Sequence, residues 1–213
     1  MTSYAELAAA VRAARPLLGD TRLVCVDGPA GSGKTTLAGR LAAALGTGVA
    51  VVHMDDLYAG WTTTGGGARL AAGVLGPLAA GRPGSYHRYD WDAGRFDDVP
   101  TAVPVPEVLI VEGCGSCPRS VDPWATLRIW VEAPAPLRLA RGLARDGEDM
   151  ATHWCRWQQE EAALFAGEDT RARADLRVNG APTVPVSSSS TSVDVIALLD
   201  DTSPLRAART MDA

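Results

Sequence analysis

The segment "GPAGSGKT", residues 28–35, constrains the fold more than any other part of the chain. It matches the pattern G-x-x-x-x-G-K-[ST], and it stands between the apolar run "TRLVCVD" and a helix-forming run, Lys34 to Leu45. In that setting backbone N–H groups turn inward around an anion, and the helix N-terminus adds partial positive charge. The segment therefore predicts a phosphate-binding turn between a buried strand and a helix. The alternative is a Gly-rich turn with no ligand.

The lysine of this segment is unusual because Lys34 is the only lysine among the twenty Lys and Arg residues. A compact ammonium fits a narrow loop that a planar guanidinium would overfill. We expect Lys34 to reach the β- and γ-phosphates of a nucleotide and Thr35 to offer its hydroxyl to Mg²⁺. The predicted nucleotide cradle consists of Gly28, Ala30, Gly31, Ser32, Gly33, Lys34, Thr35 and Thr36.

The single lysine also excludes a class of protein. Common GTPases read guanine with an Asn/Thr-Lys-x-Asp segment, and no second lysine exists to build one. No "LSGGQ"-like signature of transporter ATPases is present either. ATP, or a loosely selected nucleoside triphosphate, remains as the expected nucleotide.

Apolar runs of strand length alternate with helical patterns along the chain. The runs cover residues 21–27, 49–54, 106–113, 127–133 and 174–180, and the helices 34–45, 68–80, 136–145 and 150–166. Continuous apolarity indicates strands that are covered on both faces, as in a parallel sheet. The pattern predicts an α/β fold with about five parallel strands, helices on both faces and a small helical lid at about 142–168.

The two ends of the chain carry separate predictions. Residues 1–20 predict an amphipathic helix, with Ser3 and Glu6 at capping-box spacing and an apolar stripe of Leu7, Val11, Ala14 and Leu18. The main domain is expected to span residues 1–180. Residues 181–213 contain a Ser run typical of a flexible linker, and a last short helix is expected at about Val193 to Leu199.

Composition narrows the setting. No apolar run reaches the roughly 18 residues of a membrane helix, and the start lacks the features of a signal peptide. We therefore expect a cytoplasmic protein whose four cysteines stay reduced. A net charge of -5 argues against nucleic acid or an anionic membrane as a partner. A small-molecule partner remains compatible, and self-association into a homo-oligomer is left open.

Two carboxylates follow the second predicted strand, in "HMDDLY". The carboxyl ends of strands in open α/β sheets are where ligands bind. Phosphoryl transfer to an alcohol uses a carboxylate that accepts the hydroxyl proton. Asp55, at the strand end, is the candidate for that base. In the alternative interpretation Asp55 and Asp56 cap the following turn.

Further charged residues suit the same chemistry. Glu112 ends the apolar run "VLIVE" and could help to hold Mg²⁺ beside the phosphate loop. Arg141 and Arg145 precede a Gly- and acid-rich segment, as expected of a lid that stabilises transition-state charge. Because Arg138 also shares their helical spacing, an ordinary solvated face is the alternative.

A zinc site is the alternative interpretation of the cysteines. Cys114 and Cys117 form C-x-x-C, and His153 with Cys155 could complete four ligands. One C-x-x-C with an improvised second pair is a weak pattern. We favour Cys114 and Cys117 as small residues in a tight turn.

Taken in order, "GPAGSGKTT", "MDDLY", "YHRYDW", "VLIVEG", "RLARGLARD" and "ADLRVNG" resemble the uridine kinase family of P-loop kinases over roughly residues 22–180. The resemblance implies the P-loop NTPase fold, with ATP and Mg²⁺ as cofactors. It also implies Asp55 as the base, Glu112 near magnesium and Arg141 and Arg145 at the start of the lid. The acceptor residues that it implies are Tyr58, Tyr89, Asp90 and Trp91. "YHRYDW" could equally be a packed aromatic strand.

The chain departs from that family after the base motif. "TTTGGGARLAAGVLGPLAAGRP" replaces the usual His-Pro-Asp-Ala-Phe-Asp-like segment, so the Asp that would hold ribose hydroxyls has no evident counterpart. We therefore expect an ATP-dependent kinase for a small-molecule hydroxyl, with a nucleoside as the first candidate acceptor. The alternatives are a kinase for a nucleoside monophosphate or another small alcohol, and a nucleotide-binding regulatory ATPase.

Overall fold

A central parallel sheet organises the computed structural model, which describes residues 2–181 and 195–199. Its strands are β2 (Arg22–Asp27), β3 (Val49–His53), β8 (Val108–Glu112), β9 (Ala125–Glu132) and β10 (Leu176–Asn179). The spatial order is β10-β9-β2-β8-β3, and every neighbouring pair is parallel. The predicted α/β fold with five parallel strands is confirmed.

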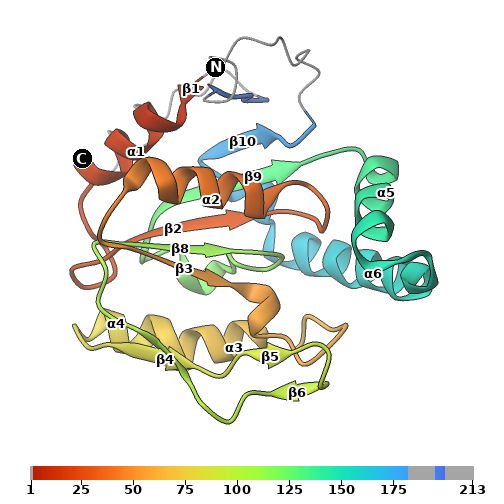
Figure 1. Ribbon diagram of the computed structural model, residues 1–213. Helices are drawn as coiled ribbons and strands as arrows, with labels where there is room; N and C mark the ends of the chain where they lie inside the picture. The colour runs from red at the N-terminus through yellow and green to blue at the C-terminus, as the bar shows by residue number, and fades with distance from the viewer. Residues whose placement is uncertain (1, 182–194, 200–213) are drawn as a thin grey trace.

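Two apolar clusters cover the sheet, one on each face. Val24 and Val26 of β2 pack with α1 (Tyr4–Ala13) and α2 (Lys34–Leu45), which lie above the sheet in Figure 1. Leu23 and Cys25 point to the other cluster, which contains residues of the helical segment at 66–79 and of α6. The strands are apolar throughout because both of their faces are buried.

The helical segment at 66–79 matches the helix predicted for 68–80. It consists of α3 (Gly66–Leu70), a π-helical stretch (Ala71–Leu75) and α4 (Gly76–Ala79). Two small hairpins follow that the apolar pattern did not predict. β4 (Gly84–Tyr86) pairs with β7 (Thr101–Val103), and β5 (Tyr89–Asp90) pairs with β6 (Arg95–Phe96). In Figure 1, β4, β5 and β6 lie below β3, on the side where α3 and α4 lie.

The predicted helices at 136–145 and 150–166 are α5 (Ala135–Asp146) and α6 (Ala151–Glu168). A 3₁₀ turn, η4 (Glu148–Met150), joins them after Gly147. We call this unit the α5–α6 pair; it projects beside the phosphate-loop end of the sheet (Figure 1). The other short elements are η1 (Met54–Asp56), η3 (Arg119–Val121) and α7 (Thr170–Arg173).

The N-terminal helix has the predicted capping box, in which Ser3 and Glu6 bond reciprocally. It ends at Ala13 rather than near residue 20, because Ala14 is extended two residues before Pro16. The predicted stripe therefore divides. Leu7 and Val11 pack with α2, whereas Leu18 lies outside the helix in the opposite cluster.

The predicted helix at Val193 to Leu199 is wrong for the residues that the structure describes. β11 (Val195–Ile196) pairs antiparallel with β1 (Thr2–Ser3), and Leu198 bridges Val178 of β10. The backbone N–H of Asn179 also donates to the Ala197 carbonyl. β1 and the open edge of β10 supply these partners, and the strand pairing overrides the local helical pattern. The predicted linker at 182–194 lies outside the described residues.

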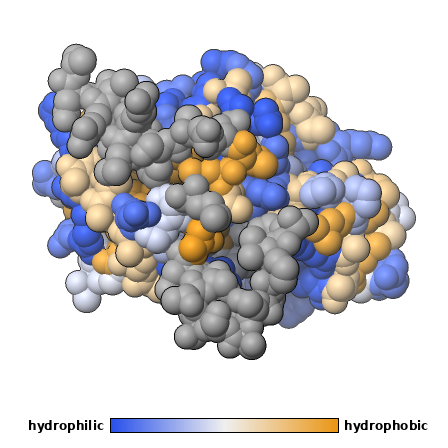
Figure 2. All heavy atoms as spheres, turned by 90° about the horizontal axis from the view of Figure 1, so that it is seen from above, coloured by the Kyte–Doolittle hydropathy of each residue, from blue (hydrophilic) through white to orange (hydrophobic). Residues whose placement is uncertain are grey.

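Figure 2 shows the face of the molecule on which α1 and β1 lie. Apolar side chains gather near its centre, and hydrophilic and apolar ones are mixed around its rim. Val195 and Leu199 are exposed large apolar residues of the last described segment. Within the described residues, no helix is long and apolar enough to cross a membrane.

Candidate active site

A cavity of about 960 Å³ lies at the carboxyl ends of β2, β3 and β8, within the size range of small-molecule sites. The phosphate loop, the α5–α6 pair and the hairpin at 89–96 all contribute to its wall. This is where ligands bind in open α/β sheets. Of the predicted site residues, those that line the cavity are Ala30, Gly31, Gly33, Lys34, Thr35, Thr36, Asp55, Trp91, Glu112, Arg141 and Arg145.

The backbone of the phosphate loop requires glycine. Gly28 has φ +141°, and a Cβ there would lie 2.1 Å from the Val131 carbonyl oxygen. Gly31 and Gly33 also have positive φ. Such dihedrals are costly for other residues, so the glycines allow the loop to fold tightly beside β9. Gly28 and Ser32 support the loop without lining the cavity, and Ser32 is fully buried.

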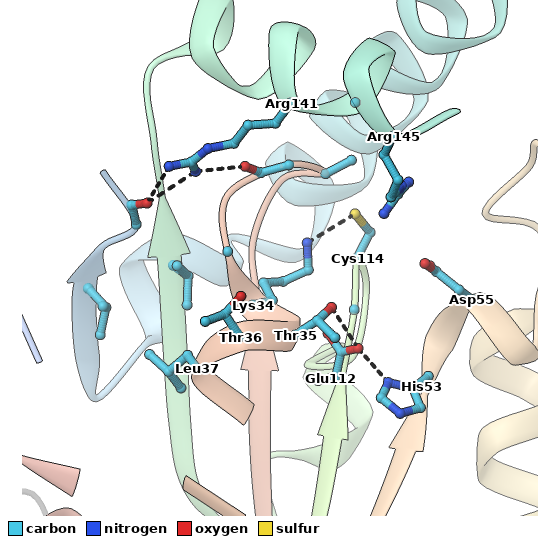
Figure 3. Close-up of a pocket in the computed structure, with 18 of the residues that line it drawn as sticks. Lys34, Thr35, Thr36, Leu37, His53, Asp55, Glu112, Cys114, Arg141 and Arg145 are labelled. Carbon is cyan, nitrogen blue, oxygen red and sulfur yellow. Dashed lines mark hydrogen bonds and ion pairs between the residues drawn. The ribbon is translucent and has the colours of Figure 1, made fainter. Parts of the chain in front are cut away.

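The side chain of Lys34 lies inside this loop and is largely buried. Its Nζ donates to the Pro29 carbonyl at 3.0 Å and lies 3.7 Å from Cys114 Sγ (Figure 3). Burial lowers the Lys34 pKa, but the acidic groups around the ammonium, Asp55 and Glu112 among them, outweigh burial and raise it overall. The ammonium therefore stays charged.

Asp27 is a residue that the sequence reasoning missed. Its carboxylate accepts backbone N–H groups of Gly28 at 2.7 Å and of Gly115 and Cys117 at 2.9 Å. These bonds join the start of the phosphate loop to the turn after β8. Desolvation raises the Asp27 pKa to about 6, although the three N–H donors oppose the rise. Its place within "CVDG" was the signal available in the sequence.

Thr35, Glu112 and His53 form a chain of hydrogen bonds at one side of the cavity (Figure 3). Thr35 Oγ1 donates to Glu112 Oε1 at 3.1 Å, and His53 Nδ1 lies 2.6 Å from the same oxygen. The hydrogen bond to Glu112 raises the His53 pKa. A hydroxyl and a carboxylate beside a phosphate loop are the oxygen ligands that Mg²⁺ prefers, so the donor set fits the predicted ion.

Asp55 and Arg145 face each other across the cavity (Figure 3). Among the described residues, no hydrogen bond or ion pair engages the Asp55 carboxylate, which is exposed and lines the cavity. Desolvation raises the Asp55 pKa, against the opposing charges of Lys34 and Arg145. Asp55 is therefore a carboxylate with a raised pKa whose oxygens are available to a ligand.

Asp56 has a different environment, although it also lines the cavity. Its carboxylate accepts from Tyr86 Oη at 3.1 Å and from Arg88 Nε at 3.2 Å. These contacts tie the end of β3 to the segment after β4. Asp56 therefore anchors that segment and does not cap the turn as in the alternative interpretation.

The predicted lid arginines contact the phosphate loop or face the cavity. Arg141 Nη1 donates to the carbonyls of Gly31 and Gly180 at 3.1 Å (Figure 3). Arg138 is not part of a solvated face. Its Nη1 donates to Glu161 at 2.9 Å and to the Ala30 carbonyl at 3.2 Å. Both members of the Arg138–Glu161 pair are buried, with side-chain exposures of 12% and 2%.

The predicted acceptor residues do not all reach the cavity. Tyr58 is buried, donates to the Cys114 carbonyl and packs against Trp157. Tyr89 packs against Phe96, and Asp90 accepts the backbone N–H groups of a turn. Only Trp91 of the four lines the cavity, so the packed-strand interpretation of "YHRYDW" holds in part.

The sequence reasoning missed one aromatic residue, Trp61. Trp61 lines the cavity with Trp91, and so do Trp154 and Trp157 of α6, which are almost fully buried. Trp61 stands alone between Gly60 and Thr62 in no periodic pattern. No sequence signal marked Trp61.

The cysteines are free thiols. Cys25, Cys114 and Cys117 are buried, whereas Cys155 is exposed on α6. Within residues 2–181 and 195–199, no group of three or more His, Cys, Asp and Glu is arranged to hold a metal ion. The described positions of the four residues therefore do not form the zinc alternative.

Two solved structures with a similar fold are described as kinases. One is a protein described as a "possible uridine kinase" from Bacillus stearothermophilus, with TM-score 0.55 and 21% identity over 74% of this chain and 88% of that one. Another is described as a "putative fructose transport system kinase" from Silicibacter sp. TM1040, with TM-score 0.56 and 23% identity over 83% of this chain and 99% of that one. No protein-family model matches the sequence, and no curated protein matches it significantly. The chain has the P-loop fold of uridine kinase-like kinases.

Proposed function

We propose that this chain is an ATP- and Mg²⁺-dependent kinase that transfers the γ-phosphoryl group to a hydroxyl of a small molecule. The observation that carries the proposal is the unpartnered carboxylate of Asp55, which shares one cavity with Lys34 and Arg145. A nucleotide held by the phosphate loop would end near these groups. Its γ-phosphate would then lie between two cations and a carboxylate that can act as a base.

The residues divide the reaction between them. Asp55 accepts the proton of the acceptor hydroxyl while the hydroxyl oxygen bonds to the γ-phosphorus. The bond between the γ-phosphorus and the β,γ-bridging oxygen breaks and releases ADP. Lys34 and the loop N–H groups stabilise the charge that develops on the phosphates. Arg145, which projects from α5 towards Asp55 in Figure 3, would face the transferred group.

Mg²⁺ fits the donor set of Thr35 and Glu112 and would supply charge neutralisation on the phosphate oxygens. His53 contacts the same Glu112 oxygen and holds the carboxylate in place.

We call the part of the cavity lined by Trp61, Trp91, Asp56 and Arg88 the acceptor end. Its composition supports a nucleoside as the first candidate acceptor, because the edges and faces of Trp61 and Trp91 suit a flat base. Arg88 and Asp56 stand at the same end with polar groups for hydroxyls or amides. A nucleoside monophosphate or another small alcohol is the alternative acceptor.

An acceptor screen tests the proposal. ADP release from Mg²⁺-ATP is measured with nucleosides, nucleoside monophosphates and sugars, and the phosphorylated product is identified. We expect one of these acceptor classes to stimulate ADP release and to yield a product with one added phosphate. ATP turnover that no acceptor changes would instead indicate a regulatory ATPase.

A further inference from the structure

Trp61 contacts both the α5–α6 pair and the hairpin at 89–96. Its ring stacks on His153 at 5.4 Å between centroids and meets the edges of Trp154 at 6.1 Å and Trp157 at 6.2 Å. Towards the hairpin it meets Trp91 at 5.9 Å. Trp61 is thus a junction between two segments that are far apart in sequence.

Trp61 is also part of the cavity wall, so a ligand at the acceptor end would touch it. Trp91, its neighbour in that wall, is 43% exposed and donates from Nε1 to the Asp55 backbone carbonyl at 3.1 Å. The indole pair therefore stands beside the candidate base. An acceptor that places a hydroxyl on Asp55 would pack against this pair.

A path of contacts runs from Trp61 to Arg145. Trp154 meets the Trp61 ring, and its Nε1 donates to Asp146 at 3.0 Å. The Arg145 guanidinium lies 5.8 Å from the centre of the Trp154 ring and is also bonded to Asp146 at 2.7 Å. The position of Arg145 over the cavity thus depends on Trp154, which is almost fully buried.

α6 is also fastened to the phosphate loop. Glu161 accepts the Ala30 N–H at 2.7 Å, one turn beyond Trp157 on the same helix. Trp157 donates to Glu161 at 3.1 Å. The helix that Trp61 contacts therefore holds the nucleotide-binding loop as well.

We propose that Trp61 is a positioning residue that couples the filling of the acceptor end to the placement of Arg145, so that the phosphoryl group goes to the acceptor rather than to water. The proposal rests on the proposed function. A bound acceptor stabilises the Trp61 position, Trp61 stabilises Trp154, and Trp154 holds Arg145 towards Asp55. By linkage, ATP and the acceptor then strengthen each other's binding.

Trp61→Ala and Trp61→Phe separate this role from simple packing. In each variant the ratio of phosphorylated acceptor to inorganic phosphate is measured with Mg²⁺-ATP and the best acceptor of the screen. We expect Trp61→Ala to lower that ratio by about tenfold, raise the acceptor KM and leave ATP affinity within about threefold. Trp61→Phe should restore most of the ratio, because it retains an aromatic ring. Trp124→Phe, outside the cavity wall, is the matched control.

Hydrogen exchange gives a readout that needs no acceptor. We expect amides at 151–160 of α6 to exchange faster in Trp61→Ala than in Trp61→Phe, while those of β2 stay unchanged. Trp61→Leu, which fills part of the space without an aromatic ring, serves if the alanine variant fails to fold.

The outcomes separate the two proposals. An unchanged transfer ratio in Trp61→Ala, or unchanged exchange in α6, overturns the role of Trp61 while the kinase proposal stands. If no acceptor stimulates the wild-type protein, the kinase proposal fails, and the coupling role to an acceptor fails with it.

Discussion

Glu161 of α6 and Ala30 of the phosphate loop share a hydrogen bond of 2.7 Å between a buried carboxylate and a backbone N–H. The partner of that carboxylate, Arg138 of α5, donates to the carbonyl of the same Ala30 at 3.2 Å. One buried ion pair thus holds both polar groups of a single loop residue. The shape of the phosphate loop depends on the α5–α6 pair.

Glu161→Gln is expected to destabilise the protein by about 3 kcal/mol, because the change leaves the buried Arg138 guanidinium without a counter-charge. ATP affinity should fall as well, since the loop loses its support. Urea unfolding and nucleotide titration measure the two effects. Arg156→Gln is the control: it breaks an exposed ion pair on the same helix and should cost less than about 1 kcal/mol. Equal losses in the two variants would contradict the bracing role.

Asp55→Asn is expected to lower turnover by about 10²-fold or more with ATP affinity nearly intact, because the base is lost and the phosphate loop is not. Steady-state kinetics and nucleotide titration measure both. The same change should stabilise the fold at neutral pH. Since desolvation raises the Asp55 pKa, its ionised form opposes folding above that pKa, and the gain should shrink at lower pH. Asp98→Asn, at an exposed aspartate, is the control and should change neither turnover nor stability.

Asp27 predicts a pH dependence of stability. Its pKa is raised from 3.8 to about 6, so between these values the folded chain binds more protons than the unfolded chain. This contribution is complete below about pH 3.8 and is lost as the pH rises through about 6, a change of about 3 kcal/mol. Urea unfolding from pH 4 to 7 should show a step in wild type and in Asp98→Asn that is smaller by about this amount in Asp27→Asn. A step of wild-type size in Asp27→Asn would assign it to another group.

Gly142→Ala sets helix propensity against packing. Alanine in place of glycine favours a helix by about 0.5–1 kcal/mol, but a Cβ at Gly142 would lie 2.2 Å from Trp154 Cζ2. Overpacking of this kind costs about 1–3 kcal/mol, so we expect a net loss of stability. Gly167→Ala in α6 is the matched control, because its Cβ would meet nothing within 4 Å. Thermal unfolding should rank Gly167→Ala above wild type and Gly142→Ala below it.

Lys34→Arg is expected to lower turnover by about tenfold or more although it keeps the charge, because the buried loop has no room for a planar guanidinium. Arg82→Lys, the reverse exchange at an exposed position, is the control and should leave turnover unchanged. Wild-type turnover in Lys34→Arg would show that the loop tolerates the larger group.

Features with local signals were predictable from the sequence. The phosphate loop between β2 and α2 and the capping box of α1 are written within a few neighbouring residues. The five apolar runs became the five parallel strands. Asp55 and Glu112 meet at one cavity because parallel strands end at the same edge.

Features that depend on distant partners were not predictable. Arg138 and Glu161 resemble solvated charges in the sequence, and only their mutual contact shows that they are buried. β11 is two residues long, and its partner β1 lies at the other end of the chain. Trp61 belongs to no periodic pattern, so its contacts with α6 required the tertiary structure.

The pairing of β1 with β11 also bears on how the protein is made. Val195 to Ala197 contribute to the cavity wall, and β11 is held there by Thr2–Ser3. On a ribosome Thr2–Ser3 emerges long before Val195 to Ala197. The phosphate loop can therefore form during translation, whereas this wall must wait until residues 195–197 have been synthesised, since contacts so distant in sequence form late.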